Sequence, residues 1–383
     1  MLLNIYAWIV AIISIFFLLF ALTNAFWLWI YSKKPKYFDG AKVSVCIPAR
    51  NEEKNIEKCI RSLLNQSYKN YNLYVLDDNS TDKTGEILAR LAEEFPGKIN
   101  ILHGKPLEQG WTGKIFAMSQ IVAQAAGELM LFTDADTVHN PDSIAFAVSN
   151  LIVHNADMVS GYIGQRTKTF GEKITVPLMY MLSCFVLPTF LNRVTPFPFT
   201  SVAIGQYIMI KKSTFDAIGG YSSMKNLISE DVALARLVKS RGYKTIFIDC
   251  KNAAACRMYT GYKESSNGIM KNIFSFMNNN DILLLFALIA FGLFLTLPFP
   301  LFVTRFIYEV SHGLPLASAT ILLGINVIAM FLVWTLVAIF QRTSPLIPFL
   351  YPVLFFNILY IACLSYIKTK NGSGYVWKGR VVH

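Results

Sequence analysis

Long uncharged stretches at both ends of the chain flank a middle section whose hydrophobic pattern changes every few residues. Residues 1–32 contain no Lys, Arg, Asp or Glu, and the apolar run at 5–31 is long enough to cross a bilayer. The run lacks the basic start of a signal peptide, so we expect an uncleaved membrane anchor. Lys33, Lys34 and Lys36 follow at once. Because positive charge favours the cytoplasmic side, we expect the section beyond them in the cytoplasm.

The middle section, 42–262, alternates short β-branched runs with amphipathic helical runs. The pattern predicts strands over 43–47, 73–76, 99–102, 128–132, 207–210 and 244–248, and helices over 51–66, 82–95, 114–126 and 231–240. Strands that alternate with helices predict a mainly parallel sheet with helices on both faces. We therefore expect an α/β domain here.

The C-terminal region, 282–367, is again apolar. Its uncharged stretches at 282–304, 314–340 and 343–367 are each long enough to cross a bilayer. The third stretch contains prolines, which also suits a broken or re-entrant element. Three full crossings would place the tail, 368–383, outside, whereas its Lys and Arg residues favour the inside. The sequence thus leaves three or four crossings in the whole chain as alternatives.

Another uncharged stretch, 174–192, lies inside the α/β section. A crossing there would put Asp136 and the later Glu230-Asp231 pair on opposite sides of the membrane, so we reject it. Prolines and aromatic residues continue to position 200, a composition typical of a segment in the membrane interface. We expect an interfacial segment at 174–200.

Composition supports a membrane protein. The 383 residues are 54% hydrophobic with a mean hydropathy of +0.43, which ordinary soluble domains rarely reach. The net charge of +11 fits a surface that faces anionic headgroups or anionic substrates. Nucleic acid is not an expected partner, because the sequence has no aromatic-interleaved basic motif and no zinc spacing. The six cysteines form no Cys-x-x-Cys pair, which favours reduced thiols over a metal site or disulfides.

Acidic residues follow several of the expected strands. The first strand runs into Pro48-Ala49-Arg50-Asn51-Glu52, the second into Asp77-Asp78, and the strand at 128–132 into Asp134-Ala135-Asp136. The carboxyl ends of parallel strands meet at one edge, where α/β sheets bind nucleotides. Two carboxylates there suit Mg²⁺ or Mn²⁺ bound together with a diphosphate. The alternative for each acidic group is a turn or helix cap, and for Glu230-Asp231 a favourable charge at a helix start.

In order and separation these motifs resemble those of the inverting family 2 glycosyltransferases, which have a GT-A fold. The resemblance covers about residues 42–262. The loop Gly110-Trp111-Thr112-Gly113-Lys114, the apolar segments and the terminal Trp377-Lys378-Gly379-Arg380 look more narrowly like the membrane-bound branch of the family. That branch glycosylates carotenoid acids of the diaponeurosporenoate type and hopanoid-type lipids, and ceramide glucosyltransferases are more distant relatives.

For the donor, the resemblance implies a nucleotide-sugar site at the sheet edge. Pro48, Glu52 and Asp78 would hold the uridine, with Asp77 in support. Asp136 would ligate a Mg²⁺ or Mn²⁺ ion on the diphosphate, and Asp134 would share the metal or face the donor sugar.

The resemblance also assigns the reacting groups. Asp231 matches the catalytic base and Glu230 its neighbour. Lys114 matches a basic position that offsets phosphate charge, although a lysine at a helix start is often merely solvated. Arg257 is a candidate for the diphosphate. Processive synthases of the family carry Gln-x-x-Arg-Trp at this place, whereas Met258 replaces the tryptophan here, which favours a single transfer.

The expected function is transfer of a hexose, with glucose from UDP-glucose as the first choice, onto a membrane lipid such as a carotenoid acid or other terpenoid. Inversion by a single displacement needs a base and charge stabilisation at the departing diphosphate, so no covalent nucleophile is required. The alternatives are a ceramide-type or polyprenyl-phosphate glycosyltransferase, or an inactive transferase-like membrane scaffold. We expect a multi-pass protein of the cell membrane with a cytoplasmic catalytic domain.

Overall fold

The computed structural model describes residues 1–185, 188–227, 229–276, 280–370, 375–377 and 380–382. Its chain divides into two compact units. One, the helical unit, comprises Met1–Ala25, Thr167–Leu187 and Met258–His383, and the other, the sheet unit, comprises Phe26–Arg166 and Pro188–Arg257. The predicted interfacial segment at 174–200 is therefore divided between the two units.

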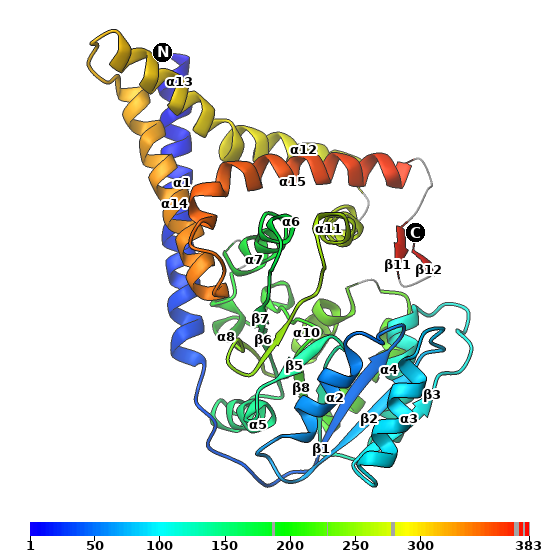
Figure 1. The fold of residues 1–383 in the computed structure, drawn as a ribbon. Helices are drawn as coiled ribbons and strands as arrows, with labels where there is room; N and C mark the ends of the chain where they lie inside the picture. The colour runs from blue at the N-terminus through cyan, green and yellow to red at the C-terminus, as the bar shows by residue number, and fades with distance from the viewer. Residues whose placement is uncertain (186–187, 228, 277–279, 371–374, 378–379, 383) are drawn as a thin grey trace. The chain divides into compact units, whose positions relative to one another are not determined.

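The sheet unit is built on a seven-stranded sheet with the order β3-β2-β1-β4-β8-β6-β9 (Figure 1). The strands are β1 (Val43–Ala49), β2 (Tyr71–Asp77), β3 (Ile99–His103), β4 (Leu129–Phe132), β6 (Met158–Tyr162), β8 (Ile208–Lys211) and β9 (Thr245–Asp249). Strand β8 runs antiparallel to β4 and β6, and the other neighbouring strands are parallel. The predicted mainly parallel α/β sheet is confirmed.

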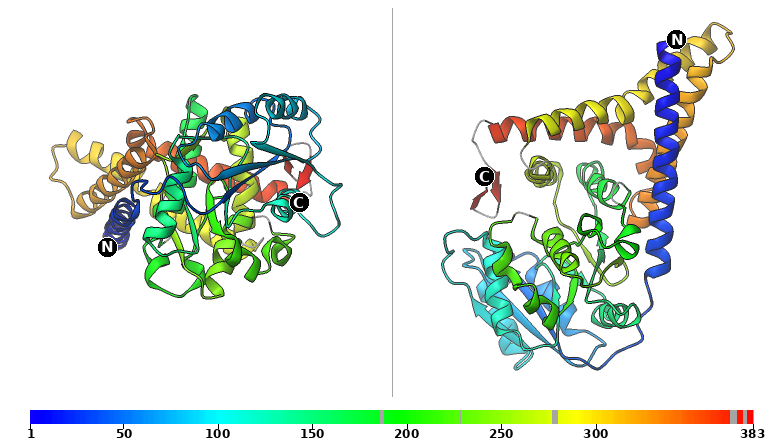
Figure 2. Two further views of the ribbon diagram at one scale, coloured as in Figure 1. Left: turned by 90° about the horizontal axis from the view of Figure 1, so that it is seen from below. Right: turned by 180° about the vertical axis from the view of Figure 1, so that it is seen from behind.

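Helices pack on both faces of this sheet (Figures 1 and 2), which explains why residues 43–47 of β1 are all buried. The helices of the sheet unit are α2 (Ile56–Leu64), α3 (Thr84–Glu94), α4 (Gly113–Gln124), α5 (Ser143–Val153), α8 (Leu191–Val194), α9 (Lys212–Ala217) and α10 (Glu230–Ser240), with the 3-10 turns η1 (Pro198–Thr200) and η2 (Gly220–Met224). Apolar side chains of α4 and α10, among them Ile121 and Val238, share one core with Met130 of β4.

Helix α2 begins at Ile56, so the prediction of a helix from Asn51 was wrong. Asn51 has a φ of 52°, and its N–H donates to Ser80 Oγ at 3.0 Å. The N–H of Glu52 donates to Thr84 Oγ1 at 2.8 Å. These groups bond to the loop after β2 instead of starting a helix, and they fix the loops after β1 and β2 to each other.

A small second sheet, with the order β5-β10-β7, was not predicted. Its strands are β5 (Thr137–His139), β7 (Gly164–Gln165) and β10 (Ala254–Cys256). Such short strands leave no alternating pattern to detect. The antiparallel pairing places Cys256 opposite Thr137, so the next residues on each strand, Arg257 and Asp136, are brought beside each other.

The helical unit contains the C-terminal apolar helices. Residues 281–311 form α12 (Asp281–Phe291), the π-helical turn η3 (Gly292–Thr296) and α13 (Pro298–Ser311), and they are followed by α14 (Ser318–Gln341) and α15 (Ile347–Lys370). The continuous run 281–311 counts as one helix. Together with α14, α15 and α1 (Leu2–Tyr31), it gives four helices among the described residues that are long and apolar enough to cross a membrane. Pro352 lies inside α15, which is one helix from end to end.

Within the helical unit, the first part of α1 runs beside α13 and α14 (Figure 2). Ala7 and Ala11 of α1 share a core with Ala319, Leu322 and Leu323 of α14. Small alanine side chains allow helix backbones to approach closely, as in membrane helix pairs.

The other helices that the structure describes in this unit are α6 (Phe170–Lys173), α7 (Val176–Phe185) and α11 (Tyr262–Phe276). None of the four long apolar helices found among the described residues falls within 174–200.

Two sequence predictions concern residues that are described only in part. In the tail at 368–383, positions 371–374, 378–379 and 383 lie outside the described residues, while β11 (Tyr375–Trp377) pairs with β12 (Arg380–Val382). The cysteines whose side chains are described are free thiols, in agreement with the prediction: Cys46, Cys59, Cys250, Cys256 and Cys363. The side chain of Cys184 is outside the described part.

Close packing of β6 against β9 gives a stability prediction. A Cβ atom on Gly161 would lie 1.9 Å from the carbonyl oxygen of Ile248, so Gly161→Ala must push the two strands apart. We expect a loss of about 3 kcal/mol in the free energy of unfolding, measured as a lower melting temperature of the detergent-solubilised protein. Gly164→Ala is the matched control, because its nearest neighbour would be the Ala255 Cβ, at 3.2 Å, and the nearest carbonyl oxygen would be 3.5 Å away. Equal losses of stability in the two variants would contradict the close packing of β6 against β9 as the cause.

Candidate active site

The acidic motifs meet at one edge of the seven-stranded sheet. Strand β1 lies between β2 and β4; Ala49 pairs with Asp77, and Cys46 with Phe132. From β1 the chain builds the sheet outward through β2 to β3, and β4 is then added on the other side of β1. This change of direction is a topological switch point, where open α/β sheets bind their ligands.

On the β1–β2 side, the side chains of Glu52 and Asp78 are buried, with 7% and 6% of their surface exposed. The N–H of Asp78 donates to the carbonyl oxygen of Ala49 at 2.8 Å, and the guanidinium of Arg50 donates to the carbonyl oxygen of Asp78. Asn55 Nδ2 donates to Glu52 Oε2 at 2.9 Å. Two acidic residues are thereby held at the sheet edge.

Asp77 has a structural role. Its Oδ1 accepts the N–H of Ser80 at 3.0 Å, which fixes the turn after β2. This is the turn-capping alternative that the sequence left open for the Asp77-Asp78 pair, and it holds for Asp77.

Lys114 joins the β4 motif to the start of α10. Its Nζ lies 2.8 Å from Asp134 Oδ1 and 2.8 Å from Glu230 Oε1. Burial disfavours the charge of Lys114, but the carboxylates of Asp134 and Glu230 outweigh this effect and raise its pKa well above the usual value. Lys114 is therefore a permanent cation between two motifs that are far apart in the sequence.

Asp231 is held by backbone donors. Its Oδ2 accepts the N–H of Gly205 at 3.0 Å, and its Oδ1 accepts the N–H of Val232 at 2.8 Å. Burial and the neighbouring Glu230 carboxylate raise the pKa of Asp231 to about 6, against the opposing effect of Lys114 and the two N–H groups. A carboxylate of this kind is ionised at neutral pH and is a stronger base than an exposed aspartate.

Asp136 has an excess of negative charge around it. Burial and the nearby Asp134 carboxylate raise its pKa. The described residues include no group of three or more His, Cys, Asp or Glu side chains that could hold a metal by themselves. A pair of carboxylates instead fits a cation that takes its other ligands from phosphates and water, as Mg²⁺ does. Asp134 and Asp136 would hold such a cation.

A pocket beside the Lys114 bridge contains residues to which the sequence assigned no role. It encloses about 300 Å³, part of it open to solvent, and Gly205 and Tyr221 line it together with Lys114, Asp134 and Asp231. A Cβ on Gly205 would lie 3.0 Å from Lys114 Nζ, so a larger residue here would require the lysine to shift by a few tenths of an ångström. Neither Gly205 nor Tyr221 was among the residues predicted for the site.

The pocket gathers only part of the predicted site. Lys114, Asp134, Glu230 and Asp231 line it directly, whereas Asp136 follows on the same loop. The backbone of Arg257 lies beside Asp136 through the β5–β10 pairing. Pro48, Glu52, Asp77 and Asp78 lie along the neighbouring strand ends instead.

A mainly parallel sheet with carboxylates at its switch point defines a GT-A type nucleotide-diphospho-sugar transferase fold. Residues 44–219 match the model of the family described as Glycosyl transferase family 2. The chain therefore contains a glycosyltransferase family 2 domain, as its motifs predicted.

Several known proteins are similar to this chain. A beta-monoglucosyldiacylglycerol synthase from Nostoc sp. is 38% identical over 108 residues, which are 28% of this chain and 22% of that protein. A 4,4'-diaponeurosporenoate glycosyltransferase from Staphylococcus haemolyticus is 24% identical over 256 residues, 65% of this chain and 66% of that protein. The chain thus spans less than a quarter of the first relative and slightly less than two thirds of the second.

The solved structure of a mannosyltransferase from Pyrobaculum calidifontis, in complex with GDP-Man and Mn²⁺, shares the fold. Its TM-score is 0.56 at 19% identity, over 96% of this chain and 99% of that one. At this identity the likeness concerns the fold alone.

The Lys114 bridge gives a pH-dependent prediction. Lys114→Met leaves Asp134, Glu230 and Asp231 without their cation, so we expect a loss of about 1–2 kcal/mol in the free energy of unfolding near pH 8, the value being reduced because the Lys114 side chain is 39% exposed. Lys114 stabilises ionised carboxylates. Its contribution is therefore present above about pH 6, the pKa of Asp231, and decreases as the pH falls through that value.

Thermal unfolding of both proteins across this pH range measures the difference. Lys225→Met is the control, because it removes the same charge from a lysine that lies over the Trp111 ring, 5.0 Å from its centre. A loss that is the same at every pH would contradict the electrostatic coupling of Lys114 to the Asp231 carboxylate.

Proposed function

We propose that this protein transfers a hexose, with glucose from UDP-glucose as the first candidate donor, onto a lipid of the cell membrane, with inversion at the sugar. The observation that carries the proposal is the Lys114 bridge, which brings Asp134 on the donor side and the Glu230-Asp231 pair to one pocket. The relatives named beta-monoglucosyldiacylglycerol synthase and 4,4'-diaponeurosporenoate glycosyltransferase support a lipid acceptor. A carotenoid acid or another terpenoid is the class of acceptor that we favour.

The donor would lie along the carboxyl ends of β1, β2 and β4. Glu52 and Asp78 would accept hydrogen bonds from the uridine, with Pro48 beside it and Asp77 fixing the turn. A divalent cation on Asp134 and Asp136 would supply charge stabilisation to the diphosphate. The GDP-Man and Mn²⁺ complex of the similar mannosyltransferase is compatible with either Mg²⁺ or Mn²⁺ here.

The acceptor proton would go to Asp231. The N–H groups of Gly205 and Val232 hold the Asp231 carboxylate in one orientation, and its pKa of about 6 leaves it ionised near pH 7. A hydroxyl that loses its proton to Asp231 attacks the anomeric carbon as the bond to the diphosphate breaks, and this single displacement inverts the centre. Lys114 keeps positive charge beside Asp134, and Arg257 would add a second cation next to Asp136.

The acceptor class changes the role of the base. A carboxylic acid is already ionised at neutral pH, so a carotenoid acid needs no proton removed. Asp231 is then less important than it is for a hydroxyl lipid. Met258, in place of the aromatic residue of processive enzymes, is consistent with a single transfer.

The membrane setting is also part of the proposal. The four long apolar helices support a multi-pass protein with its catalytic domain in the cytoplasm. Phe197 and Phe199 are 54% and 60% exposed and stack with ring centres 5.7 Å apart, which suits the proposed interfacial segment. The inactive scaffold is the weaker alternative, because the chain carries every acidic motif and because Asp134, Glu230 and Asp231 line one pocket.

The decisive measurement is mass spectrometry of lipids from cells that express the protein. We expect a hexose-sized addition to a membrane lipid. For a hydroxyl acceptor, Asp231→Asn should lower product formation by about 10²–10⁴-fold, because it removes the base. For a carboxylate acceptor it should retain most of the activity. Asp216→Asn is the control, since Asp216 is 55% exposed and forms an ion pair with Lys212 of its own helix.

The acceptor screen should include ceramides and polyprenyl phosphates, which separate the enzymatic alternatives from the proposal. Absence of any hexosylated lipid from wild-type membranes and from every purified acceptor would contradict the function.

Donor binding is a separate prediction. We expect UDP to bind with at least about tenfold higher affinity in Mg²⁺ or Mn²⁺ than in EDTA, because the metal joins the carboxylates to the diphosphate. Asp136→Ala should remove this difference, as measured by isothermal titration calorimetry. Asp216→Ala serves as the control. Metal-dependent UDP binding that persists in Asp136→Ala would contradict the proposal that Asp136 holds the metal.

A further inference from the structure

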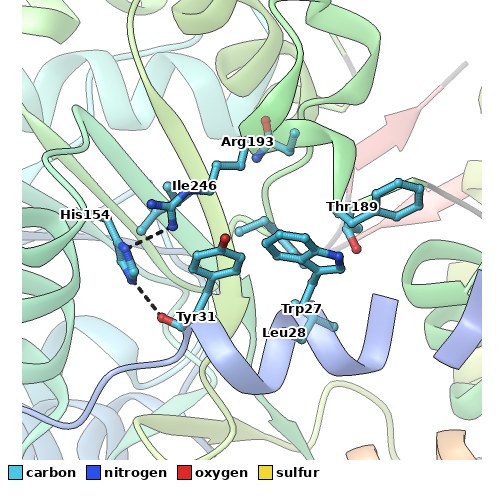
Figure 3. Close-up of a pocket in the computed structure, with 10 residues that line it drawn as sticks. Trp27, Leu28, Tyr31, His154, Thr189, Arg193 and Ile246 are labelled. Atoms are coloured by element: carbon cyan, nitrogen blue, oxygen red, sulfur yellow. Dashed lines mark hydrogen bonds between the residues drawn. The ribbon is translucent and has the colours of Figure 1, made fainter. Parts of the chain in front are cut away.

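A second pocket of the sheet unit lies at the end of α1 and shares no residue with the candidate active site (Figure 3). It has about 360 Å³ of empty space, part of it open to solvent, and Trp27, Tyr31, His154, Asn192 and Arg193 are among its lining residues. We propose that this pocket binds the phosphate group of an anionic phospholipid from the cytoplasmic leaflet. Among the lining residues that the structure describes, none is acidic.

Arg193 supplies the principal charge. Its guanidinium carbon lies 4.1 Å from the centre of the Tyr31 ring, and its Nη1 lies 3.2 Å from His154 Nδ1. His154 Nε2 is 2.8 Å from the carbonyl oxygen of Tyr31 and therefore carries the proton, which leaves Nδ1 as the acceptor for Arg193 (Figure 3). Burial lowers the pKa of His154, in agreement with this neutral form. The contact uses one of the five N–H donors of a guanidinium, and such a group recognises phosphate well.

Asn192 adds a buried donor. The residue is 4% exposed, and its Oδ1 accepts hydrogen bonds from Ser201 Oγ at 2.8 Å, Thr245 Oγ1 at 2.8 Å and Lys239 Nζ at 3.2 Å. These donors fix which end of the amide is oxygen. Its Nδ2 is buried and has no hydrogen-bond partner among the described residues. An unpaired buried donor costs about 1–3 kcal/mol, and a ligand oxygen in the pocket would remove this cost.

The surroundings are cationic. Lys239 is 8% exposed, and its hydrogen bonds go to neutral oxygens of Asn192 and Thr200. Lys244 Nζ donates to the carbonyl oxygen of His154 at 2.6 Å. The nearby positive charges are thus bonded to neutral oxygens, so an anion in the pocket would be attracted to all of them.

The position along α1 favours a lipid over a soluble anion. Trp27 and Tyr31 stack at 4.9 Å in the last turns of the predicted span, directly before the lysine cluster at 33–36. Val194, the residue after Arg193, is 61% exposed, and the stacked Phe197 and Phe199 that follow are 54% and 60% exposed. Aromatic rings, exposed apolar side chains and cations together are typical of the depth at which lipid headgroups lie.

The test measures lipid retention by the full-length protein. Wild-type protein is taken from nanodiscs of phosphatidylcholine with about 20% phosphatidylglycerol into mild detergent, and bound lipids are counted by native mass spectrometry. We expect phosphatidylglycerol to be retained in preference to phosphatidylcholine, and Arg193→Gln to weaken its retention by about tenfold or more. Asn192→Asp should have the same effect, because it keeps the acceptor oxygen but replaces the Nδ2 donor by a negative charge.

Arg236→Gln is the matched control. Arg236 is exposed on α10, does not line the pocket and carries the same charge. Unchanged melting temperature and UDP binding in Arg193→Gln would show that the fold and the donor site are intact, so this test stands apart from the proposed function. Equal retention of the two lipids, or equal retention by Arg193→Gln and Arg236→Gln, would overturn the proposal. If inorganic phosphate alone displaced phosphatidylglycerol, the pocket would be a site for free phosphate, and the proposal of a phospholipid ligand would be wrong.

Discussion

The Lys114 ammonium group is the interaction on which the candidate active site depends. The loop after β4 and the start of α10 each carry two carboxylates, and a pair of like charges 4 Å apart repels by about 4 kcal/mol at an effective dielectric constant of 20. Lys114 offsets this repulsion through two contacts of 2.8 Å, one to each motif. Gly205 makes room for the lysine, and the same residue donates its N–H to Asp231. One cation and one glycine thus hold Asp134, Glu230 and Asp231 around one pocket.

Much of the fold was predictable because it follows from local pattern and one geometric rule. Short β-branched runs followed by amphipathic helices identify parallel strands, and parallel strands bring their carboxyl ends to one edge. This reasoning predicts that Asp77-Asp78 and Asp134-Asp136 lie at one edge of the sheet, where they follow the two strands that flank β1. It failed at the start of α2, because Asn51 and Glu52 bond to Ser80 and Thr84, and such tertiary bonds override helix propensity. The error at α2 does not change the predicted positions of the acidic motifs, because those positions depend on where the strands end.

The remaining features could not be predicted, because each joins residues that are distant in the chain. Nothing in the sequence near Lys114 indicates Glu230 as its partner, and the three residues of β10 give no period that would bring Arg257 beside Asp136. Asn192 lies at the end of a stretch that was interpreted as uncharged and interfacial. Its importance comes from donors on other elements, Ser201, Thr245 and Lys239, which fix its amide. Such contacts arise when distant segments pack together, so local composition cannot predict them.

Helix α10 connects the two pockets physically. Its first residues are Glu230 and Asp231, and Lys239 near its last turn bonds to Asn192 and Thr200, about 12 Å further along the axis. Burial lowers the pKa of Lys239 to about 8, because its partners are neutral. The unfolded chain therefore binds a proton between about pH 8 and 10.4 that the folded chain releases, so this contact adds stability as the pH rises through that window. At neutral pH the buried charge is instead a cost, which an anion near Asn192 would reduce. Any such ligand would act on the same helix that carries Asp231, the proposed base, so α10 is the element through which the two sites would affect each other.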